Sequence, residues 1–230
     1  MSMVSTWIQQ TYNEVLRDKV PRVFGVYAGV PVRNAPILDR TKNHPNYKHG
    51  FLRSIEEGVD DGDTVCLVGF GRGVSSVYAV RAGAAEVIAY EGAREMIDVG
   101  LETLEIQGLE SRVSIRHAIV GDAIDLYGTP EGAGTVSPAE LPGCDVLVLD
   151  CEGAETGILD GFGSPPDRAI VETHPPKGAS DGRVRELLSE LGYATIEANE
   201  YEPDRPEKSV LVATDPRREQ RAATPDAGVE

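Results

Sequence analysis

The sequence predicts an α/β fold with a seven-stranded, mostly parallel sheet, an antiparallel C-terminal strand and helices on both faces. From residue 64 onward, short apolar strands alternate with helical segments, which is the pattern of a doubly wound sheet. The run 145–149 is almost wholly apolar, as in strands that are covered on both faces. The last two strands are close together in the chain, which predicts an antiparallel pair.

The elements are expected in the following order. Strands are predicted at 64–68, 85–90, 113–117, 145–149, 169–171, 193–198 and 209–213, each apolar and bounded by turn residues. Helices are predicted at 74–82, at 93–107, where Gly108 ends the segment, and at 182–191. About ten residues, among them Pro203 and Pro206, separate the last two strands, too few for the helical crossover that a parallel return needs.

Three regions are expected along the chain. Residues 1–60 form an N-terminal cap, with a helix over 7–20, one or two strands within 23–37 and a short helix at 51–59. Residues 61–214 form the main domain. Residues 215–230 are charged and contain Ala, Pro and Gly, which predicts a disordered acidic tail.

The chain is strongly acidic. It has 230 residues, with 38 Asp and Glu against 22 Lys and Arg and a net charge of −16. Such a surface repels phosphate backbones and anionic lipids, so we expect neither a nucleic-acid nor a membrane partner. The acids are spread along the chain and only five of the basic residues are Lys, which favours solvation in concentrated salt over a dedicated acidic site. This composition is typical of a halophilic organism.

The cysteines and the N-terminus indicate a reducing cytoplasmic location. Cys66, Cys144 and Cys151 have neither disulfide-framework nor zinc-site spacing, so free buried thiols are expected. Residues 1–10 have no basic start and no long apolar run, and so do not resemble a signal peptide.

A glycine-rich turn follows the first strand of the main domain. Residues 69–73 read Gly-Phe-Gly-Arg-Gly and lead into a predicted helix, whose free N–H groups face a ligand in many nucleotide sites. The spacing differs from the dinucleotide fingerprint Gly-x-Gly-x-x-Gly. A purely structural turn remains the alternative.

Three strands end directly in an acid. These are Glu91, Asp150 and Glu172. Ligands in open α/β sheets bind outside the carboxyl ends of the strands, so these acids are expected to line one crevice. Glu91 lies 22 residues after Gly69, where an acid can bond both hydroxyls of a ribose.

Over about residues 60–214 the chain resembles the class I, Rossmann-like S-adenosylmethionine-dependent methyltransferases, and within them the FkbM family. The segment 149–161, Leu-Asp-Cys-Glu-Gly-Ala-Glu-Thr-Gly-Ile-Leu-Asp-Gly, is similar to the family's Asp-Val-Glu-Gly-Ala-Glu segment. Residues 170–174 and 118–122 resemble its Val-Glu-x-His strand end and the segment near the adenine. The chain departs from the family at Leu67, Val148 and Gly92, which replace an acid, a Lys and a Pro.

The resemblance implies S-adenosylmethionine as the cofactor. The residues that it places around the cofactor are Gly69, Phe70, Gly71, Gly73, Glu91, Gly92, Ala118, Ile119 and Asp150. The loss of the acid at Leu67 leaves the contact to the methionine end open, with Asp150 or an acid of the cap as substitutes.

The resemblance also implies O-methylation of a small, hydroxylated, sugar-like molecule. The expected general base is His174, oriented by Asp150 or Glu172, because histidine has a suitable intrinsic pKa. Glu152 and Glu155 are expected to hold substrate hydroxyls, although Glu155 also suits the first turn of a helix. We expect no metal, with Mg²⁺ on Asp150, Glu152, Glu172 and His174 as the alternative.

Other interpretations stay open at this point. One is a non-catalytic module that keeps the cofactor, which the missing acid at Leu67 favours. Another is an NAD-dependent oxidoreductase, which Glu91 fits but the glycine spacing and the C-terminal hairpin do not. Tyr47, Lys48 and His49 precede the helix that enters the core, where methyltransferases often close over the cofactor; a solvated loop is the alternative for them. The oligomeric state is not predicted.

Overall fold

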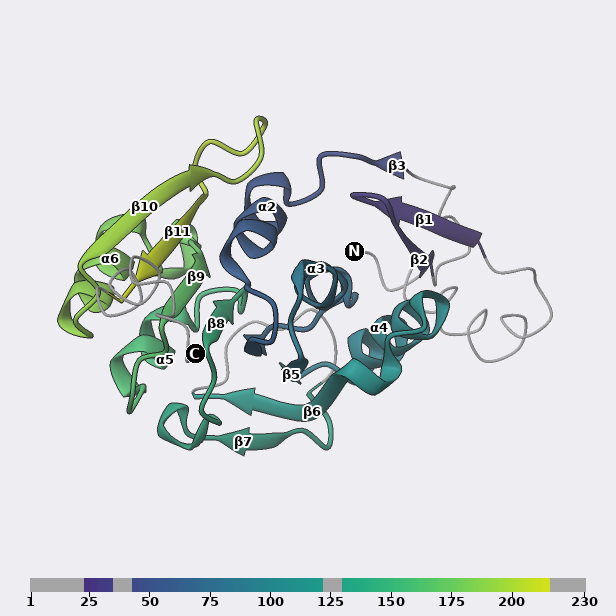
Figure 1. Cartoon of the computed structure of the whole chain (residues 1–230), viewed down its shortest axis with the longest axis horizontal. Coiled ribbons are helices and arrows are strands. Elements are labelled where there is room, and N and C mark those ends of the chain that lie inside the picture. Colours follow the sequence, from purple (N-terminus) through teal and green to yellow (C-terminus); the bar gives the residue numbers. More distant parts are fainter. Residues whose placement is uncertain (1–22, 35–42, 122–129, 216–230) are drawn as a thin grey trace, which may run out of the picture.

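The computed structural model describes residues 23–34, 43–121 and 130–215 (Figure 1). The expected helix at 7–20, Asp122 and residues 216–230 lie outside the described residues. In the described part, no helix is long and apolar enough to cross a membrane.

The main sheet has eight strands in the order β10-β11-β9-β8-β4-β5-β6-β7. Their bounds are β4 Thr64–Val68, β5 Glu86–Glu91, β6 Val113–Val120, β7 Gly134–Val136, β8 Val146–Leu149, β9 Arg168–Glu172, β10 Thr195–Glu200 and β11 Ser209–Thr214. The mostly parallel sheet is confirmed, and β11 runs antiparallel to both β9 and β10. The expected count of seven was wrong, because the short strand β7 adds to the free edge of β6 in parallel.

Helices cover both faces of this sheet, as predicted. On one face, α2 (His49–Gly58), α3 (Val74–Ala82) and α4 (Arg94–Gln107) pack on alternate strand residues such as Val65, Leu67 and Val148. On the other face, α5 (Glu155–Gly161) and α6 (Asp181–Glu190) pack on the residues between them, such as Cys66 and Leu149. The strict alternation follows from the period of two in a β-strand.

A small three-stranded sheet lies beside α4 and α3. It consists of β1 (Val23–Tyr27), β2 (Val30–Asn34) and the two-residue strand β3 (Asn43–His44), in the order β2-β1-β3. Val30 and Val32 are fully buried in the same hydrophobic cluster as α2 and α3, so this part of the cap shares the core of the main domain (Figure 1).

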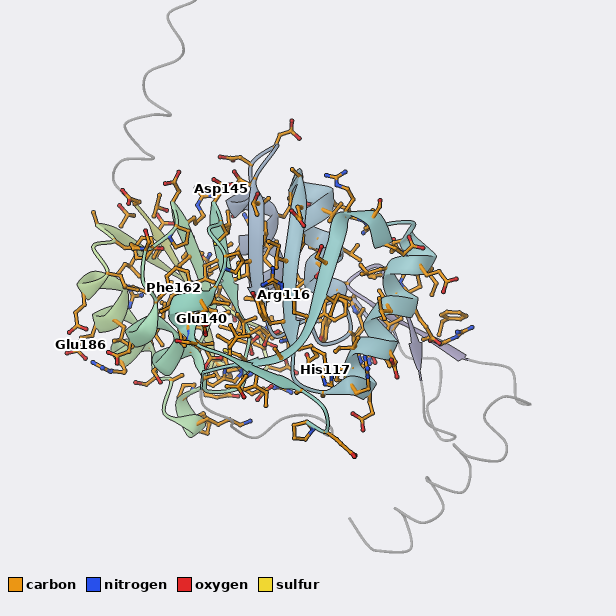
Figure 2. All side chains as sticks on the ribbon, turned by 90° about the horizontal axis from the view of Figure 1, so that it is seen from below. Arg116, His117, Glu140, Asp145, Phe162 and Glu186 are labelled. Atoms are coloured by element: carbon orange, nitrogen blue, oxygen red, sulfur yellow. The ribbon has the colours of Figure 1, made fainter. Side chains whose placement is uncertain are left out.

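Strand order brings the expected site residues to one edge of the sheet. β4 pairs in parallel with both β5 and β8, and β8 pairs with β9. Strands β5 to β7 therefore add on one side of β4 and strands β8 and β9 on its other side, so the strand order reverses at β4. The residues after these strands therefore meet at their carboxyl ends. Figure 2 shows that Asp145, which precedes β8, lies at the other end of the sheet from His117, which pairs with Glu91.

Candidate functional site

A pocket of about 880 Å³ opens at the carboxyl ends of β4, β5 and β8. Its walls include the glycine-rich turn, the end of β5, the residues after β8, the cap segment 43–48 and the β10–β11 connection, with Met96 of α4 and Ile119 of β6. Its volume lies in the range of sites that enclose a ligand of cofactor size. The acids that follow β5 and β8 line this pocket, as the strand-end pattern predicted.

One wall of the pocket, here called the glycine wall, consists of Gly69, Phe70, Gly71 and Glu91. Gly69 has φ +97°, and a Cβ there would lie 1.9 Å from the carbonyl oxygen of Asp150. Only glycine permits both this conformation and this approach. Gly69 thus brings the end of β4 into direct contact with the chain that follows β8.

Glu91 is held in place by backbone N–H groups. Its carboxylate accepts hydrogen bonds from Gly71 N at 2.8 Å and from Ala93 N at 2.9 Å. A carboxylate has about four acceptor sites, so further donors from a ligand can be bound. The acid at the end of β5 is therefore tied to the glycine-rich turn and oriented before any ligand arrives.

The expected site residues divide into two groups. Those that line the pocket are Gly69, Phe70, Gly71, Glu91, Gly92, Ile119, Asp150 and Glu152. Those that lie outside its lining are Gly73, Ala118, Glu155, Glu172 and His174. Gly73 caps α3 with φ 79° beside Gly100, and so shapes the turn from behind.

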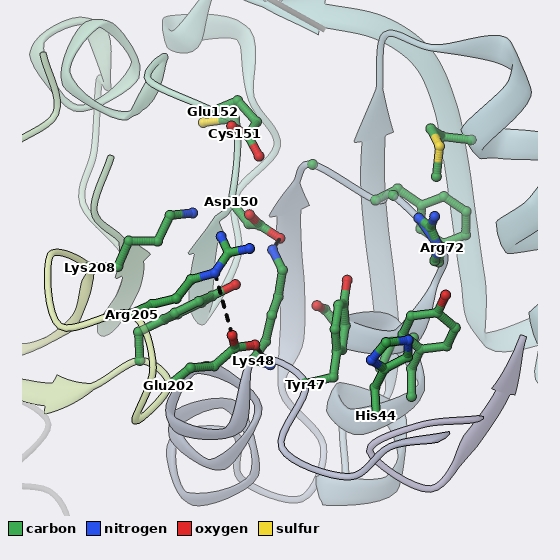
Figure 3. Close-up of a pocket in the computed structure, with 18 of the residues that line it drawn as sticks. His44, Tyr47, Lys48, Arg72, Asp150, Cys151, Glu152, Glu202, Arg205 and Lys208 are labelled. Carbon is green, nitrogen blue, oxygen red and sulfur yellow. Dashed lines mark hydrogen bonds and ion pairs between the residues drawn. The ribbon is translucent and has the colours of Figure 1, made fainter. Parts of the chain in front are cut away.

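Beneath the pocket, Lys48, Asp150, Glu172, His174 and Lys208 form a set of ion pairs, here called the charged cluster. The ammonium of Lys48 bonds to Asp150 and lies 2.9 Å from Glu172 Oε2. Lys208 Nζ lies 2.5 Å from Glu172 Oε1, and His174 Nε2 lies 3.2 Å from the same oxygen. Figure 3 shows the Lys48 side chain extending to Asp150, with Lys208 beside it.

The role of general base that we expected for His174 does not fit its surroundings. His174 is only 2% exposed, and its ring lies between Glu155 Oε1, at 2.8 Å from Nδ1, and Glu172. Neither ring nitrogen makes a regular hydrogen bond. Burial alone would lower the pKa of His174, but Glu155 and Glu172 raise it to about 9. The imidazole is therefore protonated at neutral pH and buried below the pocket.

The substrate-binding role that we expected for Glu155 does not fit its position either, because Glu155 does not line the pocket. It is fully buried at the start of α5, where its carboxylate accepts a hydrogen bond from Cys151 N at 3.0 Å and contacts His174. This supports the alternative of an acid in the first helical turn. Glu172 is fully buried as well, and its three cationic partners leave it no contact with the pocket.

Asp150 is the member of the expected catalytic set that reaches the pocket. Burial raises its pKa well above the usual range, and the neighbouring carboxylate of Glu172 raises it further, while Lys48 opposes both effects. Burial alone would lower the pKa of Lys48, but Asp150 and Glu172 hold it well above its usual range. Asp150 thus combines access to the pocket with a raised proton affinity and an adjacent permanent cation.

Lys48 reaches the cluster because the backbone before α2 is tightly held. Lys48 has φ 47° and ψ 37°, a left-handed conformation that is uncommon for a residue with a side chain. Its N–H donates to the carboxylate of Glu202, and Gly50 N donates to Tyr201 O at 2.9 Å. A Cβ at Gly50 would lie 1.6 Å from Glu200 O, so this close approach depends on glycine.

The side of the pocket near the glycine-rich turn carries aromatic rings. Tyr27 stacks on His44 with 4.8 Å between ring centroids and meets Tyr47 edge-on at 5.0 Å. The guanidinium of Arg72 lies over the Tyr27 ring at 5.5 Å, and Figure 3 shows Arg72 and His44 together on this side. The cap therefore adds flat apolar surface to the pocket, and Arg72 of the glycine-rich turn adds a cation.

Leu67, where the expected family resemblance would place an acid, is fully buried in the core between the sheet and α2 and α3. Its side chain does not reach the pocket, so this position contributes no polar contact to a ligand. Asp150, whose backbone touches Gly69, is the acid that the structure places nearest to the end of β4.

Sequence analysis did not assign Lys48, Lys208, Tyr201 and Arg205, all of which line the pocket. Lys48 had been noted only as part of a segment before a helix. One signal was present: the chain has few lysines, and all three that lie in described residues are at or beside this pocket, since Lys177 pairs with Glu152 at 2.8 Å.

Comparisons with known proteins agree with this geometry. No family model matches the chain. Ribosomal protein L11 methyltransferases of two Lactococcus lactis subspecies are 33% identical over 134 residues, which is 56% of this chain and 40% of each relative. The chain therefore matches well under half of the length of these relatives.

Solved structures share the fold at low sequence identity. The tRNA methyltransferase TrmK of B. subtilis superposes with a TM-score of 0.52 at 20% identity, covering 76% of this chain and 70% of that one. A SAM-dependent O-methyltransferase of Thermotoga maritima gives 0.51 at 20% identity, covering 71% and 64%. Together with the strand order, these likenesses show that the chain has the Rossmann-like methyltransferase fold.

Proposed function

We propose that this protein is an S-adenosylmethionine-dependent methyltransferase that acts on a small, hydroxylated, sugar-like molecule, as FkbM-type enzymes do. The observation that carries the proposal is that the glycine-rich turn, Glu91 and Asp150 face one pocket at the carboxyl ends of the strands of a methyltransferase fold. The 33% identical relatives, which are methyltransferases by name, support the same chemistry.

The pocket residues fit such a cofactor. The carboxylate of Glu91 would accept hydrogen bonds from the ribose hydroxyls, while Met96 and Ile119, which line the same pocket, offer apolar surface to the base. Gly71 has open space where a Cβ would stand, so backbone and ligand can approach closely there. When bound, the cofactor supplies an electrophilic methyl group, whose bond to sulfur breaks as the acceptor oxygen bonds to its carbon.

Asp150 is the residue that we propose as the base. Its carboxylate reaches the pocket, and its raised pKa favours uptake of the proton that the acceptor hydroxyl releases. The ammonium of Lys48 beside it favours negative charge on the acceptor oxygen while that proton leaves. His174 and Glu172 then position Asp150 and Lys48 from below and do not contact the acceptor.

The charge of the chain supports a small acceptor. The relatives and the solved structures include, by name, enzymes for a ribosomal protein and for tRNA. A net charge of −16 opposes a polyanionic substrate. The acidic surface repels the phosphates and offers few basic groups to replace their counterions. We further propose that the protein works in a salt-rich cytoplasm, without a nucleic-acid or membrane partner.

Calorimetry with S-adenosylhomocysteine tests the cofactor assignment. We expect the wild type to bind it and not to bind NAD. Glu91→Ala removes the acceptor for the ribose hydroxyls, so the affinity should fall by about tenfold or more. Glu86→Ala, at the other end of the same strand, is the matched control and should bind like the wild type.

Failure would take a clear form. Binding of NAD in place of S-adenosylhomocysteine would establish an oxidoreductase, and equal affinity in Glu91→Ala and Glu86→Ala would overturn the placement of the ribose. Transfer of a labelled methyl group to sugars, to tRNA and to ribosomal protein then identifies the acceptor class. Tight cofactor binding without transfer to any of them would favour the non-catalytic module, which the apolar Leu67 also fits.

A further inference from the structure

Three side chains of types that occur as metal ligands lie close together beneath the pocket. Ligand atoms of Asp150, Glu172 and His174 all lie within 4.8 Å of one another at the ends of β8 and β9. Two carboxylates and an imidazole are a donor set that divalent cations such as Mn²⁺ accept, once the imidazole has given up its proton. Two buried carboxylates so close together repel each other, so a cation is needed between them if both are to be ionised.

A side chain of the protein already supplies that cation. The ammonium of Lys48 bonds to Asp150 Oδ2 and lies 2.9 Å from Glu172 Oε2, so it bridges the two acids. Lys208 occupies the other oxygen of Glu172 from outside. Lys48 thus takes the central position in the set.

The position of Lys48 is set by the fold rather than by a freely moving side chain. Its left-handed backbone, its N–H bond to Glu202 and the close packing at Gly50 all hold the residue before α2. A non-glycine residue keeps such a conformation only where the surrounding structure determines it, and such residues gather at functional sites. The lysine side chain is 14% exposed, so water replaces few of its contacts.

We propose that Lys48 is a built-in cation that takes the place of a divalent metal, so that the site operates without one. This rests on the proposed function in one respect, that Asp150 faces the acceptor. Lys48 is a positioning residue that acts through Asp150: its ammonium bonds to this carboxylate and holds it where it lines the pocket. Its removal leaves Asp150, Glu172 and His174 around a vacant cation position.

The test is titration of the full chain with Mn²⁺, followed by calorimetry and by the electron paramagnetic resonance signal of the free ion. The wild type should bind Mn²⁺ no better than the control Arg53→Met, which removes an exposed cation of α2 that pairs with Glu57. Lys48→Met should gain affinity by about tenfold or more, because the two carboxylates then lack their central cation. Lys48→Arg keeps a cation and should stay at the wild-type level.

Two results would overturn the proposal. One is Mn²⁺ binding by the wild type that disappears in Asp150→Asn, since the site would then be a metal site despite Lys48. The other is a Lys48→Met protein that folds, by circular dichroism, and gains no Mn²⁺ affinity. If Lys48→Met does not fold, the uncharged Lys48→Gln makes the same comparison. Binding of S-adenosylhomocysteine, measured on each protein, tests the proposed function separately.

Discussion

The glycine wall lines the pocket and the charged cluster lies beneath it, and the two are built by different means. The wall is made by backbone groups of two segments 20 residues apart: Gly69 and Gly71 take left-handed conformations, and Glu91 accepts hydrogen bonds from the N–H groups of Gly71 and of Ala93. The cluster is made by residues that are distant in the chain, since Lys48 and Asp150 are 102 residues apart. The glycine wall therefore depends on backbone geometry, and the charged cluster depends on the balance of buried charges.

This difference indicates what determines the stability cost of a substitution in each region. In the wall, a change acts through the space around a backbone atom, so its cost depends on what a Cβ would meet. In the cluster, a change acts through uncompensated charge, so its cost depends on how many partners lose their counter-charge. Three predictions sharpen this comparison, in order of decreasing effect.

The largest effect is expected at Glu172. Glu172→Gln leaves Lys48, Lys208 and His174 without their shared carboxylate, and the free energy of unfolding should fall by about 3–5 kcal/mol. Denaturant titration measures this. Glu57→Gln, which breaks the exposed pair with Arg53, is the control and should cost less than about 1 kcal/mol. A loss at Glu172 as small as at Glu57 would show that the cluster is not held by charge balance.

The next effect is a pH dependence that belongs to the cluster. Because the pKa of His174 in the folded protein, about 9, lies above its ordinary value of 6.5, the protonated form stabilises the fold. This contribution is fully present below pH 6.5 and is lost as the pH rises through 9, and it amounts to about 3 kcal/mol. The free energy of unfolding at pH 6.5 and at pH 9.5 should therefore differ more for the wild type than for His174→Gln. Equal pH dependence in the two proteins would show that His174 is neutral in the fold.

The smallest effect compares two glycines of the wall. Gly69→Ala places a Cβ 1.9 Å from the carbonyl oxygen of Asp150, so the backbone must shift, and we expect a cost of at least about 2 kcal/mol. Gly71→Ala meets nothing within 4 Å, so only its conformation, with φ +53°, is penalised, by about 1 kcal/mol. Thermal unfolding of the two variants checks the order; a reversed order would mean that space does not govern the wall.

Much of the fold was predictable because it depends on local patterns. The strand β4 at Thr64–Val68 and the helix α3 at Val74–Ala82 have the bounds that apolar runs and helical spacing predicted. The antiparallel β11 followed from a connection too short for a crossover. The short strand β7 was not predictable, because three residues in a stretch rich in Gly and Pro carry no periodic signal.

By itself, the sequence determined the sheet, the glycine-rich turn and the meeting of Glu91 and Asp150 in one pocket, whereas the third strand-end acid, Glu172, lies buried below it. Each of these follows from residues that are neighbours in the chain or from the rule that parallel strands end at the same edge. Only the tertiary structure decided the chemistry beneath the pocket. It placed Lys48 between Asp150 and Glu172, and it buried His174 as a cation between two carboxylates. The physical reason is that protonation depends on burial and on charges within a few ångströms, and distant segments acquire these only when the chain folds.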